Sequence, residues 1–410
     1  MTDSSPYAGR SHGELAELTR ELLLAGHLID RSGMPHLISR FGREGMRDIA
    51  IQEWMAASPV YTKRVQRLLG FEGDDVETIF KGMQLDVGAP PEFMDFRYEV
   101  HDATHGTFQL DHCGALMDVE PMGEAFVHGM CHAIEDPTFD ATAAATNPRA
   151  QVRPVHRPPR LPADRTPHCA WTVTIVADAD PLPFPEQAEQ LAASMAAQLP
   201  LATPPPGLAT DDGWTSYAAA LDPDLVMERF SSATLAAVMD EVCLQGHLLS
   251  RAFLVQVAER VGAAEAAAIG AKQLCGIAGL TAKRLAVALD AGPDLDGIAA
   301  VLAVHPMFLP RAYVEVRIVR TDDTLLVAIE PCPALDEDDD LTWPAILANG
   351  DDRALQAAAQ CVAPHAHVAR GDGATWHISI DPDAPPARQP DEVTLTEFST
   401  GAGFHFHRRG

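Results

Sequence analysis

The first clear pattern along the chain is an apolar repeat at helical spacing, rich in Leu and Ala, over 13–30 and again over 234–260. Apolar side chains three and four residues apart line one face of a helix, so both stretches are predicted to be amphipathic helices. Further helices are predicted over 45–70 and 263–290. A helical layer therefore opens each half of the chain.

After each helical stretch the pattern changes to strict alternation. Phe96, Tyr98 and Val100 alternate with polar residues, and the turn DATHG leads into TFQLDHC, which predicts a β-hairpin. In the second half, YVEVRIV, RTDDT and LLVAIEPC predict another hairpin. Each hairpin is followed by a predicted helix (121–136 and 351–361), a loop with several prolines, and a last strand (170–176 and 375–380). Helices followed by antiparallel strands are typical of an α+β protein, not of a doubly wound parallel sheet.

The two halves also resemble each other residue by residue. ELLLAGHLIDR from Glu21 aligns with EVCLQGHLLSR from Glu241, an offset of 220 that also relates further Arg, Gly and Lys positions. WTVTIVADADPLP from Trp171 aligns with WHISIDPDAPP from Trp376 at an offset of 205. Such steady offsets indicate an internal duplication. We predict a first copy over 10–185, a helix and Pro-rich linker over 186–229, and a second copy over 230–400.

Composition and charge narrow the range of partners. The chain has 58 acidic against 30 basic residues, a formal net charge of −28, and such a field repels phosphate backbones and anionic membrane surfaces. No apolar run approaches the roughly 20 residues of a membrane span, and MTDSSPYAGR lacks the apolar core of a secretory signal. The seven cysteines, an odd number, suit a reducing compartment. We therefore expect a cytoplasmic protein that can form a homodimer and whose partner is a small-molecule substrate, not nucleic acid or a membrane.

Candidate chemistry gathers in one window of the first copy. Seven of the 17 histidines and three of the seven cysteines lie between residues 101 and 169. The second copy keeps little of this histidine set. A purely structural role would tend to persist in both copies, so the first copy is predicted to be the working half.

The segment EAFVHGMCHAIED predicts a metal site. In a regular helix Glu124, His128, His132 and Glu135 lie on one face, since each residue turns the helix by about 100°. Two imidazoles one turn apart with a nearby carboxylate suit a divalent metal, zinc or iron, and His112 at the end of the hairpin would add a ligand from a second element. The alternative is that both helix histidines lie on the surface beside their acidic neighbours.

The cysteines suggest a second mechanism. Cys113, Cys131 and Cys169 stand at a strand end, in a helix and just before the last strand, three elements that can pack around one cleft. A thiolate beside a protonated histidine has a lowered pKa and becomes a nucleophile, and Glu135 would orient that histidine or act as a base. The alternative is that these cysteines are small buried hydrophobes.

The locally basic stretch RPVHRPPR lies close to this window. Arg153 and Arg157 are predicted to bind a substrate carboxylate through paired hydrogen bonds. The alternative is a surface loop stiffened by its prolines.

Together these residues resemble a known family. Cys113, then Cys131 four residues before Glu135, and then Cys169 leading into WTVTI follow the order found in the L-2-amino-thiazoline-4-carboxylic acid hydrolase-like family. The resemblance covers about 95–176. It implies hydrolytic opening of a small ring containing sulfur and nitrogen, which yields an N-carbamoyl amino acid.

We therefore expect a metal- or cysteine-dependent hydrolase that acts on a C=N or amide bond of a small heterocyclic or amino-acid-derived substrate. In one version a metal-bound water attacks the carbon, and in the other a thiolate does so. Two alternatives stay open: a metal- or small-ligand-binding protein without turnover, used for sensing or storage, and a thiol redox protein.

Overall fold

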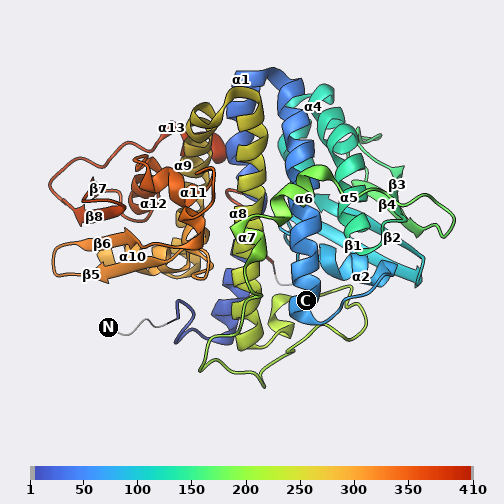
Figure 1. Ribbon diagram of the computed structural model, residues 1–410, viewed down its shortest axis with the longest axis horizontal. Helices are drawn as coiled ribbons and strands as arrows, with labels where there is room; N and C mark the ends of the chain where they lie inside the picture. Colours follow the sequence, from blue (N-terminus) through green and yellow to red (C-terminus); the bar gives the residue numbers. More distant parts are fainter. Residues whose placement is uncertain (1–4, 408–410) are drawn as a thin grey trace.

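The computed structural model describes residues 5–407. It contains two four-stranded antiparallel sheets, each following helical segments, and so confirms the predicted α+β class. Figure 1 shows long helices upright in the middle of the molecule and one sheet on each side of them.

The elements of the first copy follow the predicted order of helices and then strands. Its helices are α1 (His12–Leu69), α2 (Val76–Met83), α3 (Gly114–Val119), α4 (Glu124–His128), α5 (Glu135–Thr146), α6 (Glu186–Ala192) and α7 (Met195–Gln198). Its strands are β1 (Met94–Asp102), β2 (His105–Cys113), β3 (Ala150–His156) and β4 (Cys169–Ile175). The helix predicted over 121–136 is interrupted, because a π-helical turn over Gly129–Ile134 separates α4 from α5.

The second copy repeats this order. Its helices are α8 (Ser232–Val261), α9 (Ala263–Ala288), α10 (Leu295–Val304), α11 (Trp343–Ala348), α12 (Arg353–Val362) and α13 (Asp391–Thr396). Its strands are β5 (Val316–Arg320), β6 (Leu325–Ile329), β7 (Ala366–Arg370) and β8 (Thr375–Ile380).

The two sheets share one topology. Their strand orders are β1-β2-β4-β3 and β5-β6-β8-β7, so the third strand of each copy lies at an edge. The register matches as well, since Phe108 faces Trp171 and Val327 faces Trp376. Both indoles are fully buried. This agreement in order and register supports the duplication.

The edge strands β3 and β7 are elements that the sequence reading missed. It assigned these stretches to proline-containing loops, and β3 does contain Pro154. Proline has no N–H to donate to a ladder, so it is tolerated at the edge of a sheet but not inside it. The edge position of β3 therefore reconciles the proline with the strand.

α1 reverses direction at Gly42, which gives the helix two arms. This glycine has φ 71° and ψ 177°, a region that only glycine occupies readily. Asp30 and Trp54, on opposite arms, are joined by a hydrogen bond of 2.6 Å, although 24 residues of straight helix would span about 36 Å. In the second copy α8 and α9 meet in the same way at Gly262, with φ 85° and ψ 160°.

Two reciprocal ion pairs join the copies across these helical arms. Arg64 binds Glu241 through two hydrogen bonds of 2.8 Å. Arg284 binds Glu21 through two hydrogen bonds of 2.7 and 2.8 Å. Each residue of one ion pair corresponds to a residue of the other pair at the offset of 220. The two copies therefore make equivalent contacts with each other, as expected for an approximate two-fold relation.

The segment that follows the sheet in each copy contacts the other copy. The N–H of Ala196 binds Glu337 of the second copy at 3.1 Å, and the N–H of Thr400 binds Asp118 of the first copy at 2.7 Å. The repeated contacts therefore extend through 186–199, a stretch that the sequence reading placed in the linker.

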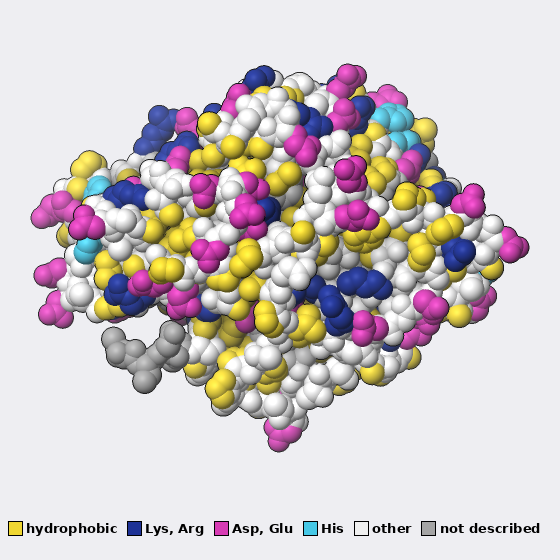
Figure 2. All heavy atoms as spheres, viewed as in Figure 1, with side chains coloured by type: hydrophobic (Ala, Val, Ile, Leu, Met, Phe, Trp, Pro, Cys, Tyr) yellow, Lys and Arg dark blue, Asp and Glu magenta, His cyan; other side chains and the backbone are white. Residues whose placement is uncertain are grey.

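The acidic side chains are dispersed over the surface. Figure 2 shows carboxylates scattered over the visible face among apolar and uncharged groups. Among the described residues, none of the helices combines the length and the apolar composition that a bilayer span requires.

Candidate functional site

A cavity of about 110 Å³, which we call the inner chamber, lies in the first copy between the two arms of α1, the loop before β1, and α5. An engineered cavity of about 150 Å³ holds benzene, so the inner chamber suits a group of about four non-hydrogen atoms. Apolar side chains form much of its wall. Its polar lining residues are His27, Asp30, Arg31, Asp86, Glu135, Thr138 and Thr142.

Two buried carboxyl groups meet where the arms of α1 pack together. Asp30 Oδ2 accepts the hydrogen bond from Trp54 Nε1, and the Asp30 carboxyl group also interacts with the carboxyl group of Glu53. Glu53 is 1% exposed. Burial raises the pKa of Asp30, and burial followed by the Asp30 charge raises the pKa of Glu53. Two neighbouring carboxyl groups resist joint ionisation, so the pair favours keeping a proton.

Asp86 supplies a third carboxyl group from the loop before β1. It accepts hydrogen bonds from the Tyr61 hydroxyl at 2.8 Å and from the Gly88 N–H at 2.6 Å. Burial raises the pKa of Asp86 to about 6, against the lowering effect of those two donors. This carboxyl group is therefore held in a fixed orientation at the chamber wall.

His27 is buried in the same wall, where the backbone of Val87 and Gly88 lies close enough to its ring to raise its pKa. Its ring packs edge-on against Phe93 at 5.4 Å between centroids. Burial, and then the charge of Arg31, lower the pKa of His27 to about 3. The imidazole is therefore neutral at physiological pH and carries one N–H and one lone pair.

Glu135 is the sequence-predicted residue that lines the inner chamber. It begins α5 directly after the π-helical turn, and its Oε2 is enclosed without a partner among the described residues. Burial raises the pKa of Glu135 to about 8, although the charge of Arg157 lowers it. A carboxyl group that titrates near the working pH is suited to accept and return a proton.

The structure brings Cys113, Cys131 and Cys169 together beside Glu135, which acts electrostatically on all three thiols. All three are free and buried, and none of them lines the inner chamber. Burial raises the pKa of each thiol, that of Cys113 to about 12. The lowered pKa expected beside a protonated histidine is therefore wrong, because desolvation dominates here. The thiols pack as small apolar groups.

Two of the predicted metal ligands, His128 and His132, lie side by side with ring centroids 4.3 Å apart, but His112 and Glu135 do not join them. His132 Nε2 lies 2.6 Å from the carbonyl oxygen of Pro158, to which it donates, and His128 lies at the surface 3.5 Å from Glu124. His112 packs instead between aromatic rings, near His168. Within residues 5–407, no group of three or more His, Cys, Asp or Glu side chains is placed to hold a metal ion.

The π-helical turn explains why that expectation fails. A common face for Glu124, His128, His132 and Glu135 assumes a constant turn of about 100° per residue. The wider turn over Gly129–Ile134 changes the rotation between His128 and Glu135. The residues present therefore do not fit the zinc or iron site that the spacing predicts.

Arg153 and Arg157 also face elsewhere than expected. Arg153 binds both carboxylate oxygens of Asp140, at 2.8 and 2.9 Å, and Arg157 pairs with Asp136. Both acids belong to α5, against which β3 packs. The two arginines therefore hold β3 and the following loop to α5, and neither lines the inner chamber.

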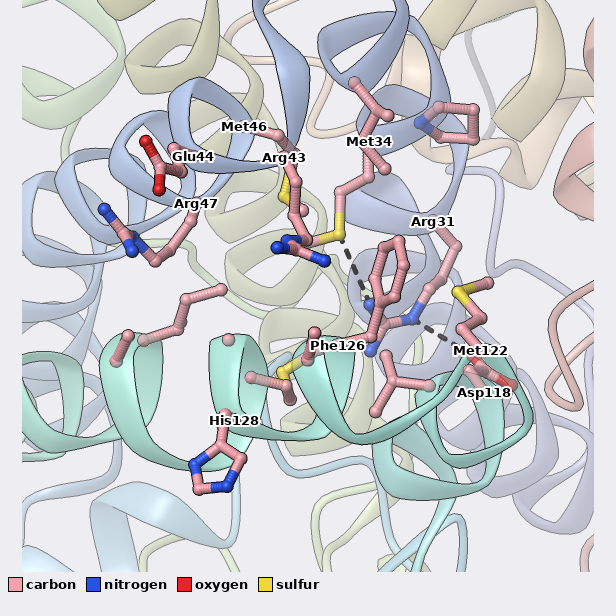
Figure 3. Close-up of a pocket in the computed structure, with 18 of the residues that line it drawn as sticks. Arg31, Met34, Arg43, Glu44, Met46, Arg47, Asp118, Met122, Phe126 and His128 are labelled. Carbon is pink, nitrogen blue, oxygen red and sulfur yellow. Dashed lines mark hydrogen bonds and ion pairs between the residues drawn. The ribbon is translucent and has the colours of Figure 1, made fainter.

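A larger cavity of about 530 Å³, which we call the outer chamber, adjoins the inner one. The two share the lining residues Arg31, Met34, Met130 and Ile134. Figure 3 shows Arg31 paired with Asp118, at 3.1 Å, beside side chains from both α1 and α4. The two chambers thus meet at Arg31, which lines both.

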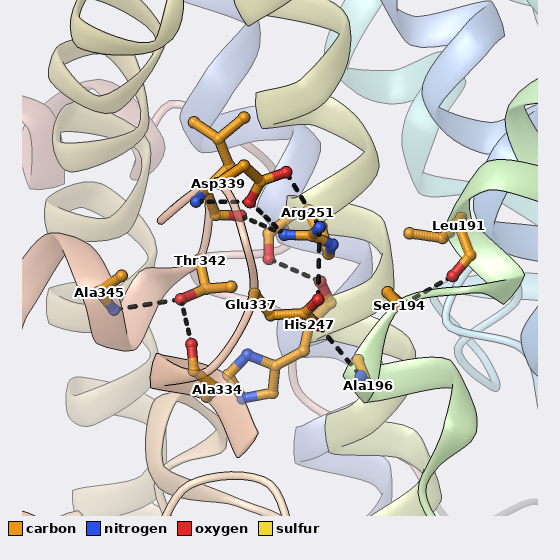
Figure 4. Close-up of polar contacts among 12 residues, drawn as sticks. Leu191, Ser194, Ala196, His247, Arg251, Ala334, Glu337, Asp339, Thr342 and Ala345 are labelled. Carbon is orange, nitrogen blue, oxygen red and sulfur yellow. Dashed lines mark hydrogen bonds and ion pairs between the residues drawn. The ribbon is translucent and has the colours of Figure 1, made fainter. Parts of the chain in front are cut away.

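The second copy keeps the scaffold of this site but not its acids. Arg251, the counterpart of Arg31, binds Glu337 at 3.4 Å and Asp339 at 2.8 Å (Figure 4). At the offset of 220, the first-copy residues Asp30, Glu53, Trp54 and Asp86 correspond to Ser250, Gln273, Leu274 and Pro306. The acidic chamber is therefore a property of the first copy.

The sequence reading missed most of this chamber. His27, Asp30, Glu53 and Asp86 lie outside the window in which histidine and cysteine gather. The signal that would have found the three acids is the aligned repeat itself, in which Asp30, Glu53 and Asp86 align with uncharged residues of the second copy.

Comparisons of the chain with known protein families, with curated proteins and with solved structures gave no match in any of the three.

Proposed function

We propose that the protein is a hydrolase that cleaves a C=N or amide bond of a small heterocyclic or amino-acid-derived molecule whose reactive group enters the inner chamber. The observation that carries the proposal is Glu135, a chamber-lining carboxyl group with an unpaired oxygen and a pKa raised by burial to about 8. The order of Cys113, Cys131 and Glu135, which resembles the L-2-amino-thiazoline-4-carboxylic acid hydrolase-like family, supports the same class of reaction.

In the proposed reaction Glu135 is the general base. Its carboxylate takes a proton from water while the water oxygen bonds to the electrophilic carbon, and the electron pair of the C=N or C=O bond moves to nitrogen or oxygen. Collapse of the tetrahedral intermediate breaks the bond from this carbon to the leaving nitrogen, or to the ring sulfur in a 2-aminothiazoline, and the protonated Glu135 returns its proton to the leaving atom. The N–H of neutral His27 stabilises the charge that develops in the intermediate.

The test compares wild type with Glu135→Gln. The assay panel contains 2-aminothiazoline-4-carboxylate, cyclic amidines and N-acyl amino acids. We expect wild type to hydrolyse at least one compound, with a rate that rises through about pH 8, and the variant to lose about 100-fold or more in kcat. Asp140→Asn, which changes a carboxylate of the same helix that binds Arg153, is the control and should keep kcat within about threefold.

Two results would contradict the proposal. Full activity of the Glu135→Gln variant would show that Glu135 is not the general base. Stoichiometric binding of a panel compound by wild type without turnover between pH 7 and 9 would instead favour a small-ligand-binding protein.

A further inference from the structure

The geometry points to a binding site in the outer chamber for an amphipathic organic anion of about 20 non-hydrogen atoms, whose reactive end reaches the inner chamber. The size follows from the chamber volume of about 530 Å³, scaled from the cavity of about 150 Å³ that holds the six carbons of benzene. This inference deepens the proposed function, because it adds the chemical class of the substrate to the reaction.

The wall of the outer chamber is suited to an apolar body. Four methionines line it (Met34, Met46, Met122 and Met130), together with Ile38 and Phe126. Methionine adapts its shape to apolar ligands of varied outline. At the rim, Met122 is 57% and Phe398 is 78% exposed, although both are large apolar side chains. Such exposure at the mouth of a cavity is expected where a ligand covers the rim.

The charges at the chamber favour an anion. Arg31, Arg43 and Arg47 line it, against two acids, Glu44 and Asp118. Arg31 forms an ion pair with Asp118, and Arg47 forms one with Asp48 on the neighbouring surface.

Arg43 differs from its neighbours. Its guanidinium lies 5.7 Å from the centre of the Phe126 ring, and no carboxylate pairs with it within residues 5–407. Figure 3 shows this side chain directed from α1 toward α4, over the chamber. A free guanidinium beside an apolar wall is the arrangement that binds a carboxylate or sulfonate attached to an apolar body.

The second copy provides an internal comparison. At the offset of 220, Arg43, Glu44 and Arg47 correspond to Ala263, Ala264 and Ala267. These alanines line a cavity of about 340 Å³ whose wall contains no arginine. The arginines are therefore not needed to build the reversal of the helical arms, which both copies have.

The second copy instead supplies part of the wall. Leu395, Phe398 and Ser399 close one side of the outer chamber. The Ser399 hydroxyl donates a hydrogen bond of 2.7 Å to Asp118, the partner of Arg31. The chamber is therefore complete only when both copies are folded together.

The test measures binding of two fluorescent probes to the full chain. The anion is 1-anilinonaphthalene-8-sulfonate, which has about 20 non-hydrogen atoms, and the neutral analogue is N-phenyl-1-naphthylamine. We expect one saturable site for each probe. Arg43→Ala should weaken the anion about fivefold and the neutral probe less than about twofold. Arg317→Ala, which removes an arginine exposed on the second sheet, should change neither.

A second variant tests the location. Ala125 lies at the exposed mouth of the outer chamber, so Ala125→Trp should weaken both probes without disturbing the fold. Equal effects of Arg43→Ala on the two probes, or anion binding untouched by Ala125→Trp, would overturn the inference. Glu135→Gln should bind both probes like wild type, because Glu135 lies outside the outer chamber. A loss of turnover in that variant therefore tests the reaction, and probe binding tests the site.

Discussion

At the scale of single residues, burial decides which predicted groups are chemically available. The same desolvation that raises the pKa of Glu135 to about 8 raises that of Cys113 to about 12. A carboxyl group shifted upward acquires a pKa near neutrality, whereas a thiol shifted upward stays protonated and loses its nucleophilicity. Sequence reasoning placed both groups in one cluster but had no means of weighing their desolvation.

The raised pKa of Glu135 predicts a pH-dependent stability. A carboxyl group whose pKa is higher in the folded state stabilises the fold fully below its unfolded value, near 4.5, and this contribution is lost as pH rises through about 8. One pKa unit corresponds to about 1.4 kcal/mol. Glu135→Gln removes the ionisation, so its Tm should exceed that of wild type by a few degrees at pH 9 and match it at pH 5.

Calorimetry at the two pH values checks this expectation. Glu124→Gln is the matched control, because Glu124 lies upstream of Glu135 and its side chain is 76% exposed. Its Tm should follow wild type at both values. A difference between Glu135→Gln and wild type that is the same at pH 5 and pH 9 would show that ionisation of Glu135 is not its cause.

At the scale of elements, periodicity predicted the helices and most strands, and local departures from regular geometry account for the rest. The arms of α1 were predicted as separate helices over 13–30 and 45–70, but not that they pack side by side. Because Asp30 and Glu53 meet only after the reversal at Gly42, their cluster is invisible to a pattern read along a straight helix. The π-helical turn hides the true direction of Glu135 in the same way.

The reversal at Gly42 predicts a specific cost for an added methyl group. A Cβ at Gly42 or Gly262 would meet no atom within 4 Å, so any destabilisation comes from the positive φ alone. Gly42→Ala and Gly262→Ala should each cost about 1–3 kcal/mol in the free energy of unfolding. Urea denaturation measures the cost.

Gly13→Ala is the control for these two variants. Gly13 lies in the first turn of α1 with open space around it, and alanine there should be neutral or stabilise the helix by up to about 1 kcal/mol. If all three variants had the same stability, the reversals would not depend on the conformational freedom of glycine.

At the scale of the whole molecule, the duplication explains both what is shared and what is not. The sheets, the helical reversals, and the Arg31 and Arg251 ion pairs recur in both copies, so they belong to the scaffold. The acids of the inner chamber and the arginines of the outer chamber occur in the first copy. The offset of 220 was readable from the sequence, but the exchange of terminal segments between copies was not, because local periodicity carries no record of contacts between distant segments.

The reciprocal ion pairs that join the copies predict how the molecule unfolds. Arg64 and Glu241 are each 3% exposed, whereas the exposed pair Arg317–Glu330 has values of 53% and 41%. Removing one partner of a buried pair leaves an uncompensated charge, so Arg64→Met and Glu241→Met should each cost about 3–5 kcal/mol. The double variant should cost less than the sum by about 1–3 kcal/mol. The same cycle at Arg317 and Glu330 should give a coupling below about 1 kcal/mol.

Urea unfolding followed by circular dichroism and by tryptophan fluorescence measures both cycles. Because the arms of both copies pack in one central layer and the terminal segments are exchanged, the two signals should change together in a single transition. A weakened Arg64–Glu241 pair should lower the midpoint without separating the signals. Additive costs at Arg64 and Glu241, or a transition that splits in two in wild type, would mean that the copies are stable separately and that the buried pair does not hold them together.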